Sequence, residues 1–232
     1  MSDWKPSGSG VWVREYPFRG NSINSSAIDM GTGGLMVVSP GTNVPESDFA
    51  ALDRLGTVKA LVAPGSYHHM GLPEWSARYP EAGLFGPTSA IAHVAGQHRA
   101  LKALQPLDVL QRLLSDEFVL EEVNGCKHPD LFLALTRGGA VTWFTNELIS
   151  NNATYPKSFV FRTLFRLNGD HPGLNVSRVA SMLIRANRRS VRTYLEGKLA
   201  SVPPTRLVPC HGEVLDDPEL GRKLAEILAR RF

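Results

Sequence analysis

The chain has 232 residues, of which 43% are hydrophobic and 20% charged, values typical of a globular protein with a sizeable core. A net charge of +3 is too small to predict nucleic-acid binding, and no apolar run approaches the ~20 residues that span a bilayer. The first residues lack the basic-then-apolar pattern of a signal peptide, and two cysteines are too few for a disulfide framework. We therefore expect a cytoplasmic protein that binds neither a membrane nor nucleic acid.

The first part of the chain predicts strands followed by a helix. Residues 11–18 (VWVREYPF) alternate apolar and polar side chains, which is the period of a half-buried strand. Residues 21–40 predict two strands joined by a glycine-rich turn at 31–34. Residues 45–56 carry the start and stop signals of a helix, with Gly56 at its end.

A buried strand and its carboxyl-terminal loop come next. Residues 58–64 (VKALVAP) form a continuous apolar run, typical of a strand that is buried on both faces. The run stops at a Pro-Gly-Ser turn, and His68 and His69 follow almost directly. Because scaffolds often place their chemistry in loops at strand ends, the adjacent histidines indicate a candidate binding site.

The rest of the sequence predicts short helices and strands without a tandem repeat or a linker. Helices are expected at 72–80, 88–104, 156–167, 178–199 and 217–232, and strands at 83–87, 128–137, 140–150 and 205–212. The strands on either side of Gly138 and Gly139 predict a hairpin. We therefore expect a single domain over residues 1–232.

Two of the expected helices could form contact surfaces. The helix at 178–199 carries five arginines opposite apolar residues at helical spacing, and we interpret them as a solvated face rather than a nucleic-acid or phosphate surface. These are Arg178, Arg185, Arg188, Arg189 and Arg192. The aromatic-rich helix at 156–167 could cap a substrate pocket or form a homodimer interface, although burial in the core is the favoured interpretation.

Four of the seven histidines lie where predicted strands give way to loops: His68, His69, His128 and His211. Neutral imidazole is the commonest metal ligand, and a catalytic zinc ion typically takes three protein ligands and a water molecule. Four histidines would supply such a site if the fold gathers them. Their spacing alone does not show that they meet.

Several motifs resemble those of a known family. The segments are GGLMVVSP (33–40), LVAPGSYHHMGLPEW (61–75), YPEAGLFGP (79–87) and VPCHGE (208–213). They resemble a divergent, functionally uncharacterised branch of the metallo-β-lactamase-like superfamily, in which His-His followed by Glu-Trp replaces the usual His-x-His-x-Asp-His. The resemblance covers nearly the whole chain. It implies an α+β fold, a four-layer αββα sandwich with its metal site at one edge of the two packed sheets.

The resemblance also shows which ligands are missing. If His69 takes the place of the motif's last histidine, His68 stands at the aspartate position. The two earlier histidines then fall on Pro64 and Ser66, which cannot replace them. The metal-bridging aspartate of the family falls on Asn146, whose neutral amide cannot balance two divalent cations.

A single metal ion, or none, is therefore what the resemblance implies. His211 matches the superfamily's last histidine, and His128 loosely matches the third histidine of the first metal site. The resemblance implies one divalent metal, with zinc preferred and iron or manganese as alternatives, held by His69 and His211 with His68 and His128 as auxiliary ligands. Cys210 adjoins His211 on a predicted strand, so its side chain is expected to point away from it, into the core.

The function implied is a metal-dependent hydrolase, in which a metal-bound water attacks an ester, amide, lactone or phosphodiester bond of a small molecule. Asn146 or Glu147 would orient that water. The missing motif residues favour an alternative of almost equal weight, a metal-free and catalytically degenerate protein that binds a small ligand or a protein. An oxidoreductase is disfavoured, because the sequence shows no flavin-binding or second metal-binding segment. The other histidines have no motif support and are expected to be structural or exposed: His93, His98 and His171.

Overall fold

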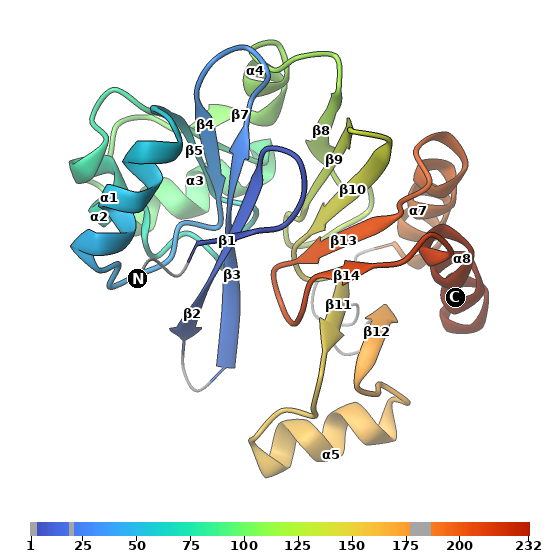
Figure 1. Cartoon of the computed structure of the whole chain (residues 1–232). Coiled ribbons are helices and arrows are strands. Elements are labelled where there is room, and N and C mark those ends of the chain that lie inside the picture. The colour runs from blue at the N-terminus through green and yellow to red at the C-terminus, as the bar shows by residue number, and fades with distance from the viewer. Residues whose placement is uncertain (1–3, 19–20, 177–186) are drawn as a thin grey trace.

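The computed structural model describes residues 4–18, 21–176 and 187–232, and its two main β-sheets pack face to face (Figure 1). The seven-stranded sheet follows chain order: β1 (Lys5–Pro6), β2 (Val11–Phe18), β3 (Asn21–Asp29), β4 (Leu35–Val38), β5 (Val58–Val62), β6 (Gly83–Gly86) and β7 (Gln105–Pro106). The five-stranded sheet has the order β14 (Leu215–Asp216), β13 (Arg206–Pro209), β10 (Ala140–Thr145), β9 (Leu131–Arg137) and β8 (Phe118–Glu122). A smaller sheet pairs β11 (Ile149–Asn152) with β12 (Gly173–Val176).

Helices cover the outer faces of both large sheets, which gives four layers (Figure 1). The first sheet packs against α1 (Glu46–Leu55), α2 (Leu72–Arg78) and α3 (Thr88–Gln97), and the second against α7 (Arg188–Ser201) and α8 (Leu220–Arg231). The short helix α4 (Leu107–Gln111) contributes to the core between the sheets. Among the described helices, none has the length and apolar character that a membrane span requires.

The alternation of side chains along a strand explains how the first sheet packs against the second sheet on one face and against helices on the other. Met36 on β4 belongs to the cluster between the sheets, whereas its neighbour Val37 belongs to the cluster beneath the helices. Successive side chains of a strand point to opposite faces, so a strand buried on both sides needs an unbroken apolar run. All four residues of β4 are buried.

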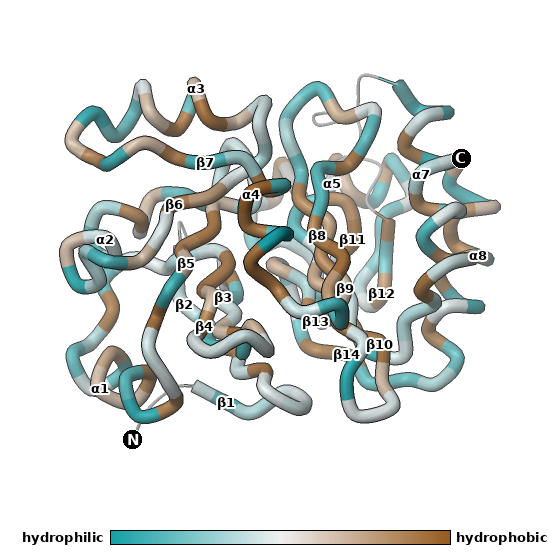
Figure 2. Tube along the Cα trace, turned by 90° about the horizontal axis from the view of Figure 1, so that it is seen from above, coloured by the Kyte–Doolittle hydropathy of each residue, from teal (hydrophilic) through white to brown (hydrophobic). Residues whose placement is uncertain are grey.

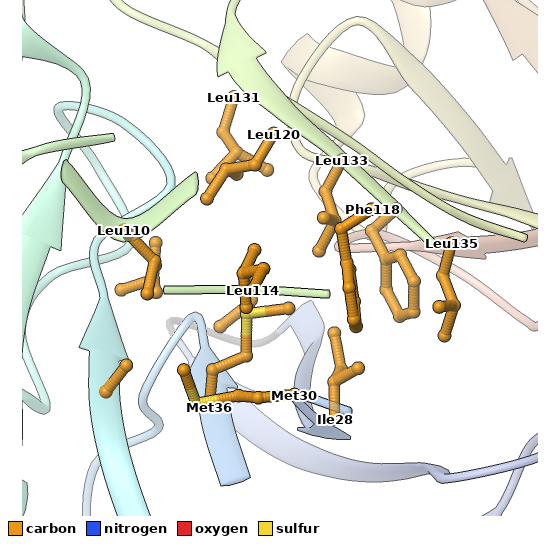
Figure 3. Packing of buried hydrophobic residues seen from close by; sticks show 14 of the residues in the cluster. Ile28, Met30, Met36, Leu110, Leu114, Phe118, Leu120, Leu131, Leu133 and Leu135 are labelled. Carbon is orange, nitrogen blue, oxygen red and sulfur yellow. The ribbon is translucent and has the colours of Figure 1, made fainter. Parts of the chain in front are cut away.

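The core between the sheets is mainly aliphatic, with a few phenylalanines. Figure 3 shows Ile28 and Met36 of the first sheet facing Phe118 and Leu133 of the second, with Leu114 between them. Full burial of one such side chain stabilises the fold by about 1.5–3 kcal/mol. The hydropathy colouring in Figure 2 agrees, with hydrophobic segments along the central strands and hydrophilic ones on the outer turns of α7 and α8.

The structure confirms the predicted α+β class and most of the order of the strands and helices. The single strand expected at 140–150 is instead divided into β10 and β11, which belong to different sheets, and the partner of β11, β12, was not expected. The hairpin turn at residues 31–34 forms between β3 and β4, and the one at Gly138 and Gly139 forms between β9 and β10. One helix differs in length, because α3 ends at Gln97 rather than near residue 104.

The aromatic-rich helix α5 (Phe159–Leu167) does not pack into the core as expected. Phe159 and Val160 are each 71% exposed, and Leu167 is 81% exposed. The reason is its position, because the small β11–β12 sheet carries α5 away from the two large sheets (Figure 1). Its suggested roles as a pocket cap or a homodimer contact remain predictions.

The arginine-rich helix is described only from residue 187 onward, so Arg178 and Arg185 lie outside the described residues. In α7 the apolar face is buried through Val191 and Leu195, as expected for a packed helix. Arg192 pairs with Glu196 one turn later, on the outside of the helix.

Candidate functional site

The loops that follow β5, β10 and β13 meet at one edge of the two sheets. An isolated bridge pairs Gly65, after β5, with Asp130 at the start of β9. The backbone N–H of Cys210 donates to the carbonyl of Thr145 at 2.7 Å, which ties the end of β13 to the end of β10. A second bridge pairs Gly212 with Asn151. Segments far apart in sequence are thus fixed to one another by their backbones.

Two of these contacts require glycine. A Cβ atom on Gly65 would lie 2.4 Å from the carbonyl oxygen of Pro129, and one on Gly212 would lie 2.1 Å from that of Asn151. Gly212 also has a φ of +100°, a conformation that L side chains rarely adopt. The Pro-Gly-Ser and His-Gly motifs therefore allow the loops to approach closely enough to bring their side chains together.

His68, Glu147 and His211 form the centre of the site. The Nε2 atom of His68 lies 2.6 Å from Oε1 of Glu147, and Nε2 of His211 lies 3.5 Å from the same oxygen. The two imidazole rings are 5.0 Å apart at an angle of 64°. Both rings thus direct a nitrogen at one carboxylate oxygen.

The charges in this group shift its pKa values in opposite directions. Burial would raise the pKa of Glu147, but its contacts with His211 and His68 outweigh burial and hold the pKa well below its usual range. Burial would lower the pKa of His211, but the hydrogen bond and charge of Glu147 raise it above the ordinary value. The arrangement therefore favours an ionised carboxylate and a protonated imidazole when no cation is bound.

Cys210 is buried with Tyr16 and Ile23, as expected, but it also belongs to the same group as His211, contrary to the expectation that it points away from that residue. The ligand atoms of His68, Cys210 and His211 all lie within 4.8 Å of one another. The expectation assumed that Cys210 continues the strand, but β13 ends at Pro209 and the alternation of a strand ends with it. Burial raises the pKa of the Cys210 thiol well above its usual value.

Asn24 holds the loop that carries Cys210 and His211. Its side-chain amide donates to the carbonyls of Pro209 and Gly212, at 2.8 and 2.7 Å. Its backbone N–H donates to the carbonyl of Cys210 at 2.9 Å. Nothing in the sequence marks this residue as part of the site, because its contacts span more than 180 positions.

Asp130 lies behind Glu147 and was not singled out by the sequence. It is 2% exposed, and its two carboxylate oxygens accept long hydrogen bonds from the backbone N–H groups of Glu147 and Leu148, at 3.4 and 3.3 Å. Burial, followed by the charge of Glu147, raises the pKa of Asp130 to about 7, although the Asn146 amide and the two backbone N–H groups oppose the rise. Asp130 therefore orients the loop that presents Glu147.

Asn146 and Glu147, the two residues expected to orient a water molecule, occupy different environments. Glu147 faces the histidines, whereas Asn146 is 2% exposed and lines a cavity of about 20 Å³ beside Cys210. Neither polar atom of its amide has a hydrogen-bond partner of good geometry among the described residues. The cavity is lined by polar and apolar side chains and has room for about one water molecule.

His69 does not lie beside His211, where the sequence placed it. The structure gives that position to His68. The Nδ1 atom of His69 instead lies 2.8 Å from Nε2 of His98, and its ring is 5.9 Å from that of His93. Burial, followed by the neighbouring imidazoles of His98 and His93, lowers the pKa of His69 to about 4.

His128, expected as an auxiliary ligand, lies against the ring of Tyr67 at a centroid distance of 5.8 Å. Among the described residues, its ligand atoms do not join those of His68, Cys210 and His211. A ligand role for His128 therefore has no support from this geometry.

No family model matches the chain, and no curated protein matches its sequence. Solved structures match over nearly its whole length. They include the DIM-1 metallo-β-lactamase, with a TM-score of 0.63 and 10% identity over 99% of this chain and 97% of that one. The fold is that of the metallo-β-lactamases.

Two further solved structures have a similar fold. The FIM-1 metallo-β-lactamase from Pseudomonas aeruginosa, solved in a mono-zinc form, has a TM-score of 0.62 and 12% identity over 98% of this chain and 94% of that one. The Flv1 flavodiiron core from Synechocystis has a TM-score of 0.63 and 15% identity over 98% of this chain and 61% of that one. The predicted αββα architecture is thus confirmed at a very low level of identity, which shows the fold alone.

The donor set at the edge of this metallo-β-lactamase fold suits one zinc ion. Two imidazole nitrogens and one sulfur are ligands that zinc accepts in catalytic sites, where a fourth position stays open. The raised pKa of Cys210 requires that its thiol lose a proton as the metal binds, which a coordinated cation brings about directly. The residues present therefore fit a mononuclear site.

Proposed function

We propose that the protein is a metal-dependent hydrolase of a small molecule, with one divalent metal ion held by His68, Cys210 and His211. The observation that carries this proposal is the convergence of their ligand atoms within 4.8 Å of one another at the edge of the two sheets. Zinc suits these nitrogen and sulfur ligands best, and iron or manganese are the alternatives.

A divalent cation in such a site lowers the pKa of a water molecule and so supplies a nucleophile near neutral pH. Ester, amide, lactone and phosphodiester bonds are the substrate classes that this chemistry serves. Glu147 is the general base in this proposal, because its carboxylate lies 2.6 Å from Nε2 of His68 and 3.5 Å from Nε2 of His211, within reach of a water molecule that the metal would bind. Asp130 holds the Glu147 loop in position through the backbone N–H groups.

Substrate would approach from the side of His211 and Glu147. Their side chains are 26% and 19% exposed, whereas that of His68 is 6% exposed. The cavity on the other side, beside Asn146 and Cys210, is too small for anything larger than water. The scissile bond would therefore lie on the solvent side of the two imidazoles.

Elemental analysis of the purified full chain, refolded or dialysed with zinc, tests the metal site. We expect about one zinc ion per chain at this site, and its loss in His68→Ala and in His211→Ala. His171→Ala is the matched control, because that histidine is exposed and its Nδ1 hydrogen bonds to the neighbouring carbonyl of Pro172. Equal zinc content in the wild type and in both site variants would overturn the metal site.

Hydrolysis of chromogenic esters, lactones, β-lactams and phosphodiesters tests the activity. We expect Glu147→Gln to lower kcat by about 10²–10⁴-fold, the usual contribution of a general base, while zinc content persists. A zinc-loaded protein that hydrolyses none of these classes would overturn the hydrolase while leaving the metal site in place.

A metal-free binding protein is the second candidate. The observation that favours it is the pairing of Glu147 with both imidazoles, which satisfies these groups without a cation. This candidate predicts that the His68–Glu147 contact persists when zinc is added. Chemical-shift changes confined to other regions during a zinc titration would support it over the hydrolase.

A further inference from the structure

A second group of histidines lies apart from the site described above. It joins His69, from the loop after β5, to His93 and His98, from α3 and its carboxyl end. The rings of His69 and His98 are 5.0 Å apart at 74°, and those of His69 and His93 are 5.9 Å apart at 81°. Two further imidazoles, from a separate element, thus lie beside that of His69, although the ligand atoms of the three are not all within 4.8 Å of one another.

Helix geometry explains how α3 supplies two of the three rings. His98 is the C-cap residue of α3, and its backbone N–H donates to the carbonyl of Val94. His93 lies more than one turn earlier, and its ring is within 3.4 Å of the side-chain amide of Gln97. Because His98 leaves the helical path at the C-cap, both its ring and that of His93 contact the buried ring of His69.

The nitrogens of His69 and His98 are already close to the separation that a shared metal ion requires. Nδ1 of His69 and Nε2 of His98 are 2.8 Å apart. With metal–nitrogen bonds of about 2.0–2.1 Å, two ligands of a tetrahedral zinc ion lie about 3.3 Å apart. An opening of about half an ångström therefore converts a hydrogen-bonded pair into a ligand pair.

Each of these two rings also lies near a backbone carbonyl, the kind of group that often orients a metal-binding histidine. His69 hydrogen bonds to the backbone carbonyl of Ser66, and His98 to that of His69. A hydrogen bond from the other ring nitrogen to a carbonyl fixes the orientation and tautomer of a ligating imidazole. His93 is exposed, and its ring, which contacts the side-chain amide of Gln97, would turn toward the other two to complete the site.

We propose that His69, His93 and His98 form a second metal site, separate from His68, Cys210 and His211, that binds a divalent cation of the zinc, copper or nickel class. These cations accept imidazole ligands, and none of the three histidines has a carboxylate partner among its described contacts. Because His93 lies at the surface, the ion exchanges with solvent. The site does not depend on the proposed hydrolase.

Zinc titration of the metal-depleted full chain, followed by calorimetry and by the ring signals of the histidines in NMR spectra, tests the proposal. We expect two equivalents in the wild type. His93→Ala should weaken one of them at least tenfold without disturbing the fold, because this side chain is exposed. His98→Gln should weaken the same equivalent, and His171→Ala is again the control.

Combining substitutions in one protein distinguishes zinc binding at the two sites. His68→Ala with His211→Ala should leave one equivalent, and zinc should still shift the signals of His69 and His98 in that protein. The proposal is overturned if His93→Ala binds as much zinc as the wild type with the same affinity. It is also overturned if the His68→Ala, His211→Ala protein binds none. If the wild type binds one zinc ion per chain, and only His93→Ala loses it, the site at His69, His93 and His98 is supported. The site at His68, Cys210 and His211 is then overturned.

Discussion

Two adjacent residues, His68 and His69, belong to two different groups of side chains, and these groups differ in the charges that surround each imidazole. His68 joins Glu147 and His211, whereas His69 joins His93 and His98. The first group contains a carboxylate, so the pKa of His211 is raised. The second has only imidazoles and burial, so the pKa of His69 falls to about 4. The comparison teaches that the surroundings, not the residue type, decide which form of the imidazole each region holds.

The largest expected effect is a pH-dependent loss of stability from His69. Below its ordinary pKa of 6.5 the unfolded chain binds a proton on this ring, whereas the folded chain does so only near a pKa of about 4. The free energy of unfolding therefore falls as the pH falls through this window, by at most about 3 kcal/mol. Urea unfolding at pH 7 and pH 4 measures it.

His69→Gln removes this titration and should reduce the loss between those two pH values. His171→Gln provides the control, because the ring it removes is exposed. An identical pH dependence in the wild type and in His69→Gln would show that the two groups do not differ in this way.

The second expected effect is the loss of the upward pKa shift of His211, in the group that contains Glu147. Glu147→Gln removes the charge that raises the pKa of His211, so that pKa should fall. The pKa of His69 should stay near 4, because Glu147 is not among the groups that shift it. NMR titration of the ring signals reports both values in one experiment, and Glu226→Gln on α8 is the distant control. An unchanged pKa of His211 in Glu147→Gln would show that the carboxylate is not the cause of the difference between the two groups.

A smaller effect concerns the hydrogen bonds by which Asn24 holds the loop that carries His211. Asn24→Ala removes the two hydrogen bonds to the carbonyls of Pro209 and Gly212, and should lower the free energy of unfolding by about 1–3 kcal/mol. The signals of His211 should shift while those of His69 and His98 do not. Asn124→Ala, at an exposed turn, is the control. Equal shifts in both groups would mean that they are coupled.

The smallest effect comes from the exposed member of the second group. In the absence of metal, His93→Ala should change the free energy of unfolding by less than about 0.5 kcal/mol. The pKa of His69 should rise slightly, because one neighbouring imidazole that lowers it is gone. Chemical denaturation and the NMR titration of His69 check the two parts. A further fall in that pKa would contradict the assigned cause.

The sequence predicted most of the elements because their signals are local. Alternation at residues 11–18 gave β2, and the apolar run at 58–64 gave β5. The segment 156–167 was correctly expected to be helical, but not its exposure, because the same apolar residues suit a core or an uncovered surface. Only the arrangement of β11 and β12 decides between these possibilities.

The site was predicted in part. His68 and His211 were both named, as was Glu147, and the structure brings these three together. The choice between His68 and His69 was not predictable, since both lie in a turn beyond β5, where side chains have no fixed alternation. The same reason explains the wrong expectation for Cys210, which follows the end of β13.

By itself the sequence determined which segments form strands and helices, and that histidines would stand in loops at strand ends. These depend on periodicity, on glycine and on apolar runs, all of which act over a few residues. Only the tertiary structure decided which imidazole meets a carboxylate and which meets another imidazole. That choice depends on contacts between residues up to 143 positions apart, from His68 to His211, which the packing of two sheets creates.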